Sequence, residues 1–194
     1  MVSAIKTVSI AVAIWFTLAQ TSSVSREDGY ILPYPTGTSY KLLQGYNGPY
    51  GHKGHAEFAY DFQMAIGAQV VAVRAGEVVH VVESNSDSTR VPGQENVLVI
   101  KHSDGTFGRY YHLTKDGSLV SVGEKVTQGK KIALSGDSGA SAGAHLHFDV
   151  TKGCYEWGCQ TIEIKFINSK ENPLKQGQVY EALRPLVGRR ETLL

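Results

Sequence analysis

Two histidines separated by a single residue, His145 and His147, are the side chains in this sequence best suited to chemistry. On a β-strand, side chains at positions i and i+2 project from the same face. Both imidazoles would then face one side of a strand, while Leu146 between them would face the core. The Gly-rich stretch 136–143 precedes the pair and would let backbone lie close to a substrate. Alone, such a pair is a weak indication of a metal site.

The chain also contains the partners that a metal site would need. A catalytic zinc ion takes three protein ligands from His, Asp, Glu or Cys and leaves one position for water. Asp61 lies in the apolar stretch FAYDF, where a carboxylate is costly to bury unless it is paired or bound to a cation, although a turn or capping role is the alternative. Together, His52, Asp61 and His147 would form a two-His, one-carboxylate shell suited to hydrolysis. His112, in RYYHL, ends an expected strand and could face the same site.

Composition indicates one globular domain and no nucleic-acid partner. The chain has 194 residues, of which 42% are hydrophobic and 19% charged, and its net charge is +1. That length suits a single domain. A charge so close to zero lacks the basic footprint that phosphate binding requires. The 21 glycines are spread along the chain, as turns between many short strands would require.

Residues 1–23 have the layout of a secretory signal peptide. A weakly positive start is followed by the mostly apolar run 7–19 and then by small polar residues, with cleavage expected between Ala19 and Ser25. The run is shorter than the roughly 20 residues that span a bilayer, although an uncleaved membrane anchor is the alternative. We therefore expect a secreted or periplasmic protein that leaves the membrane after cleavage.

Export bears on the two cysteines, Cys154 and Cys159, which lie in KGCYEWGCQ. Two nearby cysteines usually pair in an oxidising compartment. The spacing, with a glycine before each cysteine, suits a small disulfide-closed loop. The alternative is half of a metal site, which is disfavoured because the sequence has no second cysteine pair.

Short runs rich in Val and Ile, separated by turn signals, predict an all-β or mostly-β domain of antiparallel strands arranged as a barrel or sandwich. The expected strands are 70–73, 77–82, 96–102, 106–112, 131–134, 145–151 and 161–167. The Pro-, Gly- and Tyr-rich stretch 30–50 predicts a loop-like opening, and only 174–183 could hold a helical turn. We divide the chain into a signal peptide (1–23), an extended N-terminal segment (24–50), the domain (51–183) and a tail (184–194).

Four segments in order resemble the lysostaphin-type, or LytM-type, zinc metallopeptidases. They are LPYPTGTSYKLLQGYNGPYGHKG, FAYDFQMAIGAQVVAVRAGEVV, ENVLVIKHSDGTFGRYYHL and VSVGEKVTQGKKIALSGDSGASAGAHLHFDV. The last ends in the Gly-x-His-Leu-His-Phe block that is most diagnostic of the family. Each motif alone is modest, but all four in this order and at compatible spacing are specific. The resemblance covers residues from about Leu32 to about Leu183.

The resemblance implies one Zn²⁺ per chain, bound by His52, Asp61 and His147. His145 is then not a ligand, and together with His112 it would contact the water on the zinc or the developing oxyanion. The implied fold is a strongly curved antiparallel sheet, an open barrel-like sandwich with a substrate groove. The implied activity is that of a zinc metalloendopeptidase, and the usual substrate is an amide bond in the peptide stems and cross-links of peptidoglycan. We expect a monomer.

The spacing before Asp61 departs from the family's more familiar His-x3-Asp. Both His52 and His55 precede the carboxylate, and alignment on His-x-Gly favours His52 as the ligand, with His55 on the rim. His80 and His102 are expected to be ordinary strand or turn residues. Asn96 opens a strand, where it could support the site or fix a turn.

Two other functions fit the same sequence. The first is a metal-free regulatory or binding module that contacts cell-wall enzymes, and such domains typically lack one or more ligands. The second is a zinc peptidase that acts on proteins or small peptides. The catalytic segment follows soon after the leader, so we expect no long inhibitory prodomain.

Overall fold

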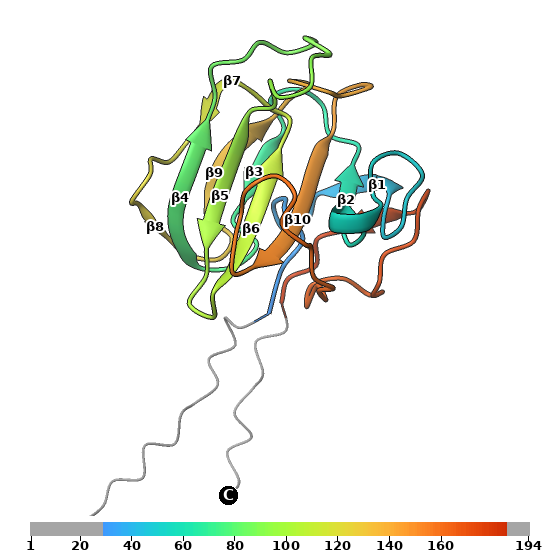
Figure 1. The fold of residues 1–194 in the computed structure, drawn as a ribbon. Helices are drawn as coiled ribbons and strands as arrows, with labels where there is room; N and C mark the ends of the chain where they lie inside the picture. Colours follow the sequence, from blue (N-terminus) through green and yellow to red (C-terminus); the bar gives the residue numbers. More distant parts are fainter. Residues whose placement is uncertain (1–28, 186–194) are drawn as a thin grey trace, which may run out of the picture.

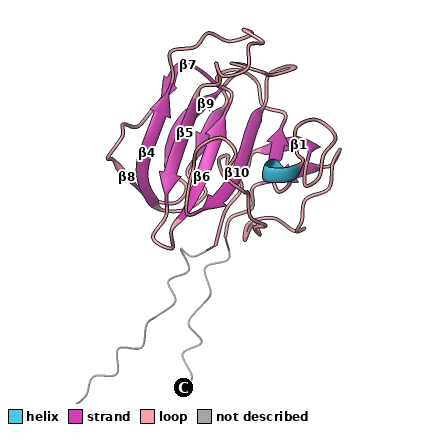
Figure 2. Cartoon of the chain, viewed as in Figure 1, coloured by secondary structure: helices cyan, strands magenta, loops and turns pink. Residues whose placement is uncertain are grey.

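The computed structural model describes residues 29–185 (Figure 1). The expected signal peptide, 1–23, lies outside these residues, as does most of the expected tail. Within the described range, none of the helical segments has the length and apolar character needed to cross a membrane. Strands and loops account for almost all of this range, and the helical exception is a single 3₁₀ turn, Gly54–Ala56 (Figure 2).

The strands form two antiparallel sheets. The large sheet has eight strands in the order β11-β1-β2-β10-β6-β5-β4-β8, and the small sheet has three in the order β3-β9-β7. Every pairing between named strands is antiparallel. The bounds are β1 Ser39–Gln44, β2 Tyr60–Phe62, β3 Gln69–Val71, β4 Gly76–Val82, β5 Val97–Lys101, β6 Thr106–Tyr111, β7 Leu113–Ser118, β8 Lys125–Val126, β9 Lys131–Ser135, β10 Leu146–Lys152 and β11 Val179–Glu181.

The core lies between the two sheets. In Figure 1 the small sheet lies behind the layer formed by β4, β5, β6 and β10. Alternate residues of β10, namely Leu146, Phe148 and Val150, are fully buried against residues of the small sheet such as Ile132. Because successive strand residues point to opposite faces, the remaining residues of β10 face away from this core. The strand therefore divides its side chains between packing and the outer face.

The outer face of the large sheet carries a second, smaller cluster and the loop that follows β10. Val99 of β5 and Phe107 of β6 are buried there, and Tyr155 of the loop packs against them. The loop is closed by the expected disulfide between Cys154 and Cys159, which is confirmed. The alternative, half of a metal site, is therefore excluded for this pair.

The mostly-β, antiparallel fold is confirmed, and six of the seven expected strands are present to within two residues. The seventh, 161–167, is not a strand, since only isolated bridges form at Thr161 and Phe166. Side chains take the backbone donors that a ladder would need, because the amide of Ile164 donates to Tyr46 Oη and that of Phe166 to Asn172 Oδ1.

Two further expectations are corrected at the edge of the large sheet. The stretch 30–50 contains strand β1, which pairs with both β2 and β11. The stretch 174–183 holds no helical turn and contributes β11 instead. Strand β11 pairs only with β1, which lies about 140 residues earlier in the chain, so neither segment alone could reveal the pairing.

The division of β10 between core and outer face makes a prediction about stability. Leu146 is fully buried between two histidines that face outward. We expect Leu146→Ala to lower the free energy of unfolding by about 2–5 kcal/mol, since it leaves a cavity in a packed core. Leu119→Ala is the control, because Leu119 is 50% exposed. Urea denaturation in the same chelator-containing buffer compares the two, and equal losses would contradict the assigned core.

Candidate metal centre

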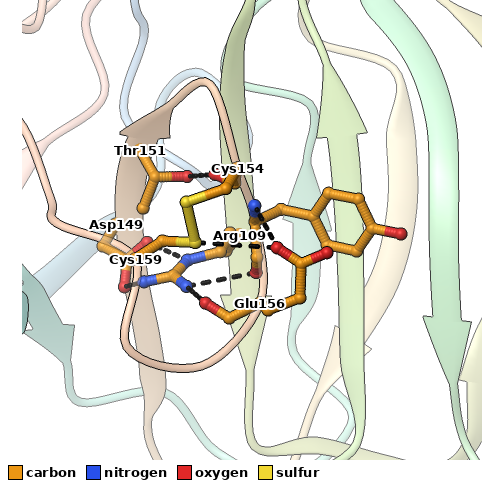
Figure 3. Close-up of a disulfide and its surroundings, with 7 residues drawn as sticks. Arg109, Asp149, Thr151, Cys154, Glu156 and Cys159 are labelled. Atoms are coloured by element: carbon orange, nitrogen blue, oxygen red, sulfur yellow. Dashed lines mark hydrogen bonds and ion pairs between the residues drawn. A yellow bond between two sulfur atoms is a disulfide. The ribbon is translucent and has the colours of Figure 1, made fainter.

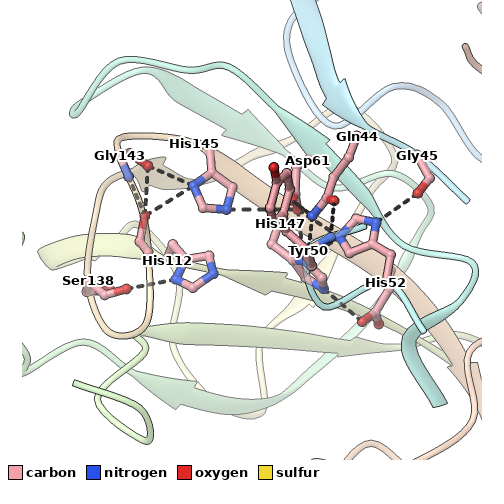
Figure 4. Close-up of polar contacts among 12 residues, drawn as sticks. Gln44, Gly45, Tyr50, His52, Asp61, His112, Ser138, Gly143, His145 and His147 are labelled. Atoms are coloured by element: carbon pink, nitrogen blue, oxygen red, sulfur yellow. Dashed lines mark hydrogen bonds and ion pairs between the residues drawn. The ribbon is translucent and has the colours of Figure 1, made fainter. Parts of the chain in front are cut away.

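Three donor atoms from separate segments meet on the outer face of the large sheet (Figure 4). Asp61 of β2 lies directly opposite His147 of β10, and the chain before the 3₁₀ turn supplies His52. Asp61 Oδ1 is 2.9 Å from His147 Nδ1 and 3.2 Å from His52 Nε2. The two nitrogens are 3.3 Å apart. The predicted ligand set is thus brought together at one point.

These separations suit a tetrahedral metal ion. Donor atoms about 2.0 Å from a tetrahedral zinc lie about 3.3 Å from one another. Two imidazole nitrogens and one carboxylate oxygen also form a donor set found in catalytic zinc sites, where the fourth position stays open. The three residues therefore fit a bound divalent cation without rearrangement of the backbone.

The two ligand histidines are oriented by hydrogen bonds on their far sides. His52 Nδ1 donates to the carbonyl oxygen of Gly45 at 2.9 Å. His147 Nε2 donates to Asp149 Oδ2 at 3.3 Å. Because these partners only accept, each ring in its neutral form carries its lone pair on the opposite nitrogen, which faces the centre. His52 would thus bind a metal through Nε2 and His147 through Nδ1.

Asp61 is held by Gln44 of the neighbouring strand. Gln44 Nε2 donates to Asp61 Oδ2 and to the carbonyl oxygen of Tyr50, each at 2.6 Å. Gln44 Oε1 accepts from the amide of Tyr50 at 3.1 Å. One amide side chain thereby fixes the carboxylate and the segment that leads to His52, and Asp61 Oδ1 remains directed at the centre.

The electrostatics of the centre favour a positive charge. Burial alone would raise the pKa of Asp61, but hydrogen bonds and charge from His147 and His52 hold that pKa well below its usual range. Burial lowers the pKa of His147, yet the hydrogen bonds to Asp149 and Asp61 outweigh it and raise this pKa to about 9. The ionised carboxylate of Asp61 therefore lies at the centre, and Asp149 favours a positive charge on the His147 ring from its far side.

His112 and His145 lie together beside the ligands. Their ring centroids are 4.6 Å apart, and His145 Nε2 is 3.9 Å from Asp61 Oδ1. His112 Nδ1 donates to the carbonyl oxygen of Ser138 at 2.7 Å, and His145 Nδ1 donates to that of Gly143 at 2.8 Å. In both rings Nε2 is consequently the nitrogen that is available to a water molecule or a substrate.

His112 lies where the chain passes from β6 of the large sheet to β7 of the small sheet. It adopts a left-handed backbone conformation with φ of 60°, which few non-glycine residues adopt. Burial is the main reason why the pKa of its ring is lowered to about 4, and the neighbouring His145 and His147 lower it further. The ring is therefore neutral at pH 7 and can accept a hydrogen bond at Nε2.

Asn96 does not line the centre but fixes the segments that hold His112. Its side chain donates to the carbonyl oxygens of Asn85 and Leu113, at 2.8 and 3.0 Å. The backbone N–H of Asn96 donates to Ser138 Oγ at 2.9 Å. Leu113 follows His112 in the chain, and the carbonyl oxygen of Ser138 accepts from the His112 ring. Asn96 therefore fixes both segments that position His112 without lining the centre itself.

The remaining histidines lie away from the three donors. The ring of His55 contacts the ring of Trp157, which lines the groove over the centre, with centroids 5.1 Å apart. His80 lies near Tyr155 on the outer face, and His102 donates to the carbonyl oxygen of Ala75. Geometry thus favours His52 over His55 as the third donor.

An open groove of about 970 Å³ runs over the centre. Its lining includes the three donors and the two other histidines, and Ala140 and residues 142–144 form part of one side. Two aromatic side chains at its rim, Tyr50 and Trp157, are 81% and 76% exposed. The groove could receive an extended chain across the metal centre.

Sequence reasoning missed Gln44, Asp149 and Arg109. Asp149 carried a usable signal, since it lies two residues after His147 on a strand and must share its face. Arg109 lies directly opposite Asp149, a register that depends on how β6 and β10 pair. Gln44 has no comparable signal, because its role follows from the pairing of β1 with β2.

Part of this chain is similar in sequence to known proteins. The chain is 41% identical over 90 residues to the peptidoglycan DD-endopeptidase ShyB of Vibrio cholerae, covering 46% of this chain and 19% of that protein. It is 37% identical over 113 residues to lysostaphin of Staphylococcus staphylolyticus, covering 57% of this chain and 22% of that protein. The chain thus spans about a fifth of the length of these relatives.

A solved structure shares the fold. The catalytic domain of a prophage-encoded M23 protein of Enterococcus faecalis superposes with a TM-score of 0.52 at 24% identity, covering 66% of this chain and 92% of that chain. The sequence profile of Peptidase family M23 matches residues 55–159, a range that contains Asp61, His112, His145 and His147 and begins just after His52. Because that match extends over more than half of the chain, this protein belongs to Peptidase family M23.

Proposed function

We propose that this protein is a secreted zinc-dependent endopeptidase that hydrolyses amide bonds in the peptide cross-links of peptidoglycan. One observation carries the proposal. His52, Asp61 and His147 present donors at tetrahedral spacing, and His112 and His145 present Nε2 atoms beside them in an open groove. Family membership supports peptide-bond hydrolysis, and the name of the Vibrio relative supports peptidoglycan as substrate.

The residues of the chain divide the work of hydrolysis. Zinc, when bound by His52, Asp61 and His147, would lower the pKa of a water molecule from 15.7 to about 7 and polarise the scissile carbonyl. His112 and His145 would accept hydrogen bonds from the attacking water at Nε2, and a ring that takes up a proton of that water would then donate it to the oxyanion as it develops. The carbonyls of Ser138 and Gly143 hold these rings in place.

Export fits this substrate. Peptidoglycan lies outside the cytoplasmic membrane, where only an exported protein meets it. The signal-peptide layout of residues 1–23 supports export. The disulfide between Cys154 and Cys159 supports it as well, because such bonds persist mainly in oxidising compartments.

The two other functions are weaker candidates. A metal-free module typically lacks a ligand, whereas all three donors are present here within 3.3 Å of one another. No feature of the groove distinguishes a cell-wall peptide from another extended peptide. Cleavage of proteins or small peptides is therefore an outcome that the substrate experiment must separate.

The proposed activity predicts the products of cell-wall digestion. We expect the purified protein to release shortened muropeptides from isolated sacculi, as measured by mass spectrometry, and a chelator to abolish release. His145→Ala should lower kcat by about 10²–10³-fold with zinc retained, because a ring that orients the water and then stabilises the oxyanion is lost.

His80→Ala is the matched control for this experiment, since His80 lies on the same sheet away from the donors. A parallel digestion of casein tests the alternative substrate. If casein is cleaved while the sacculi stay intact, the peptidoglycan proposal is overturned. Full activity of His145→Ala would overturn the role of that residue.

The two histidines before Asp61 predict a contrast in metal content. We expect His52→Ala to lose stoichiometric zinc, because one of three donors is removed. His55→Ala should retain it, since the His55 ring lies on Trp157. Metal analysis of the purified variants by atomic spectrometry decides between them. Loss of zinc in His55→Ala alone would contradict the geometry.

The exposed Trp157 predicts a role in binding substrate. Its ring lies at the groove rim, and 76% of the residue's surface is exposed to solvent. We expect Trp157→Ala to raise KM by about 3- to 10-fold, as loss of an aromatic contact would, with kcat and zinc content unchanged. Trp157→Phe should restore most of the binding. Steady-state kinetics on a soluble cross-linked muropeptide measures both, and an unchanged KM would refute the contact.

A further inference from the structure

The disulfide-closed loop, Cys154–Cys159, crosses the outer face of the large sheet (Figure 3). It follows directly on β10, and Thr151 Oγ1 donates to the carbonyl oxygen of Cys154 at 2.5 Å. The loop carries Trp157 to the groove rim. The same loop also covers a buried arginine, which the metal centre and the proposed hydrolysis do not use directly.

That arginine, Arg109 of β6, is only 1% exposed. Its Nη1 donates to the loop carbonyl oxygens of Tyr155 at 3.2 Å and Glu156 at 2.8 Å. Its Nε and Nη2 donate to the two carboxylate oxygens of Asp149, at 2.6 and 2.8 Å. A guanidinium in a protein keeps its charge, so each of these acceptors is needed while the group is buried.

Asp149 links Arg109 to the metal centre through hydrogen bonds. It is 1% exposed, and the oxygen that accepts from Arg109 Nη2 also accepts from His147 Nε2 at 3.3 Å. Register places Asp149 opposite Arg109 and His147 opposite Tyr111 on the same two strands. An unbroken series of hydrogen bonds therefore leads from the loop carbonyls to a metal ligand.

The geometry points to Arg109 and Asp149 as positioning residues that couple the disulfide-closed loop to the metal ligand His147. This inference rests on the proposed function only in requiring that the centre binds zinc. Asp149 fixes the tautomer and orientation of the His147 ring, and Arg109 fixes Asp149. The loop carbonyls hold Arg109 in turn, so the loop that presents Trp157 also tunes the affinity for the metal.

A purely structural ion pair makes a different prediction. The pair of Arg74 and Asp104 supplies the comparison, since Arg74 Nη1 donates to Asp104 Oδ2 at 2.6 Å at the turn between β5 and β6. Removing either carboxylate leaves an arginine without its negatively charged partner in that pair. Only Asp149 also touches a ligand, so only its loss should change the binding of metal.

The first measurement is zinc affinity, by competition with a chromophoric chelator. We expect Asp149→Asn to bind zinc about 10- to 100-fold more weakly, as loss of a carboxylate behind a metal-bound histidine does. Asp104→Asn should bind as the unaltered protein does. The visible absorption of the Co²⁺-loaded protein should shift in Asp149→Asn and not in Asp104→Asn, with circular dichroism showing that both are folded.

The second measurement tests the coupling to the loop. Opening the loop with Cys154→Ser and Cys159→Ser should weaken zinc binding in the same direction, by less than Asp149→Asn. In an Arg109→Lys background the same opening should have a smaller effect, because the connection is already cut. Non-additive effects in such a cycle identify residues that act through one another.

The outcomes separate this inference from the proposed function. If the unaltered protein binds no zinc, the proposed function fails. If it binds zinc and Asp149→Asn binds equally well, the positioning role is overturned while the proposed function stands. Additive effects of opening the loop and of Arg109→Lys would overturn the coupling between loop and ligand.

Discussion

The carboxylate of Asp61 is buried on the outer face of the large sheet. A buried negative charge requires positively charged or hydrogen-bond-donating neighbours, and the other residues of the centre meet this requirement. Both of its close neighbours are imidazoles, and its second oxygen accepts from Gln44. A carboxylate in such a place is costly unless cationic partners offset the lost hydration. The donors around Asp61 offset that cost, and they leave a position that a metal ion can fill. The fold supplies this arrangement through cross-strand register, since Asp61 and His147 are direct neighbours on β2 and β10.

The strand β10 satisfies two demands at once. Its inward residues build the core between the sheets, and its outward residues, His147 and Asp149, serve the centre. Moving the register of β10 by one residue would send the ligand into the core. Burial of Leu146 and Phe148 therefore fixes the position of the ligand as firmly as any contact within the site. Packing and chemistry are inseparable along this strand.

Much of this arrangement follows from local pattern. Short Val-rich runs with glycine turns predict the strands, and the i, i+2 rule predicts the shared face of His145 and His147. What the pattern could not supply is long-range pairing. The segment 161–167 has the composition of a strand, yet side chains of Tyr46 and Asn172 take its backbone groups. Gln44 and Arg109 gain their roles only through partners on neighbouring strands, so no local signal could have revealed them.

Two of the three donors lie on paired strands, whereas His52 comes from the chain that precedes the 3₁₀ turn. A cation at this centre would therefore fasten the early part of the described chain to a strand formed nearly a hundred residues later. A ligand that binds only the folded state adds to stability in proportion to the logarithm of its concentration. The availability of free zinc would then affect the lifetime of the protein, because metal-poor surroundings would weaken the attachment of the segment around His52 and favour its proteolysis.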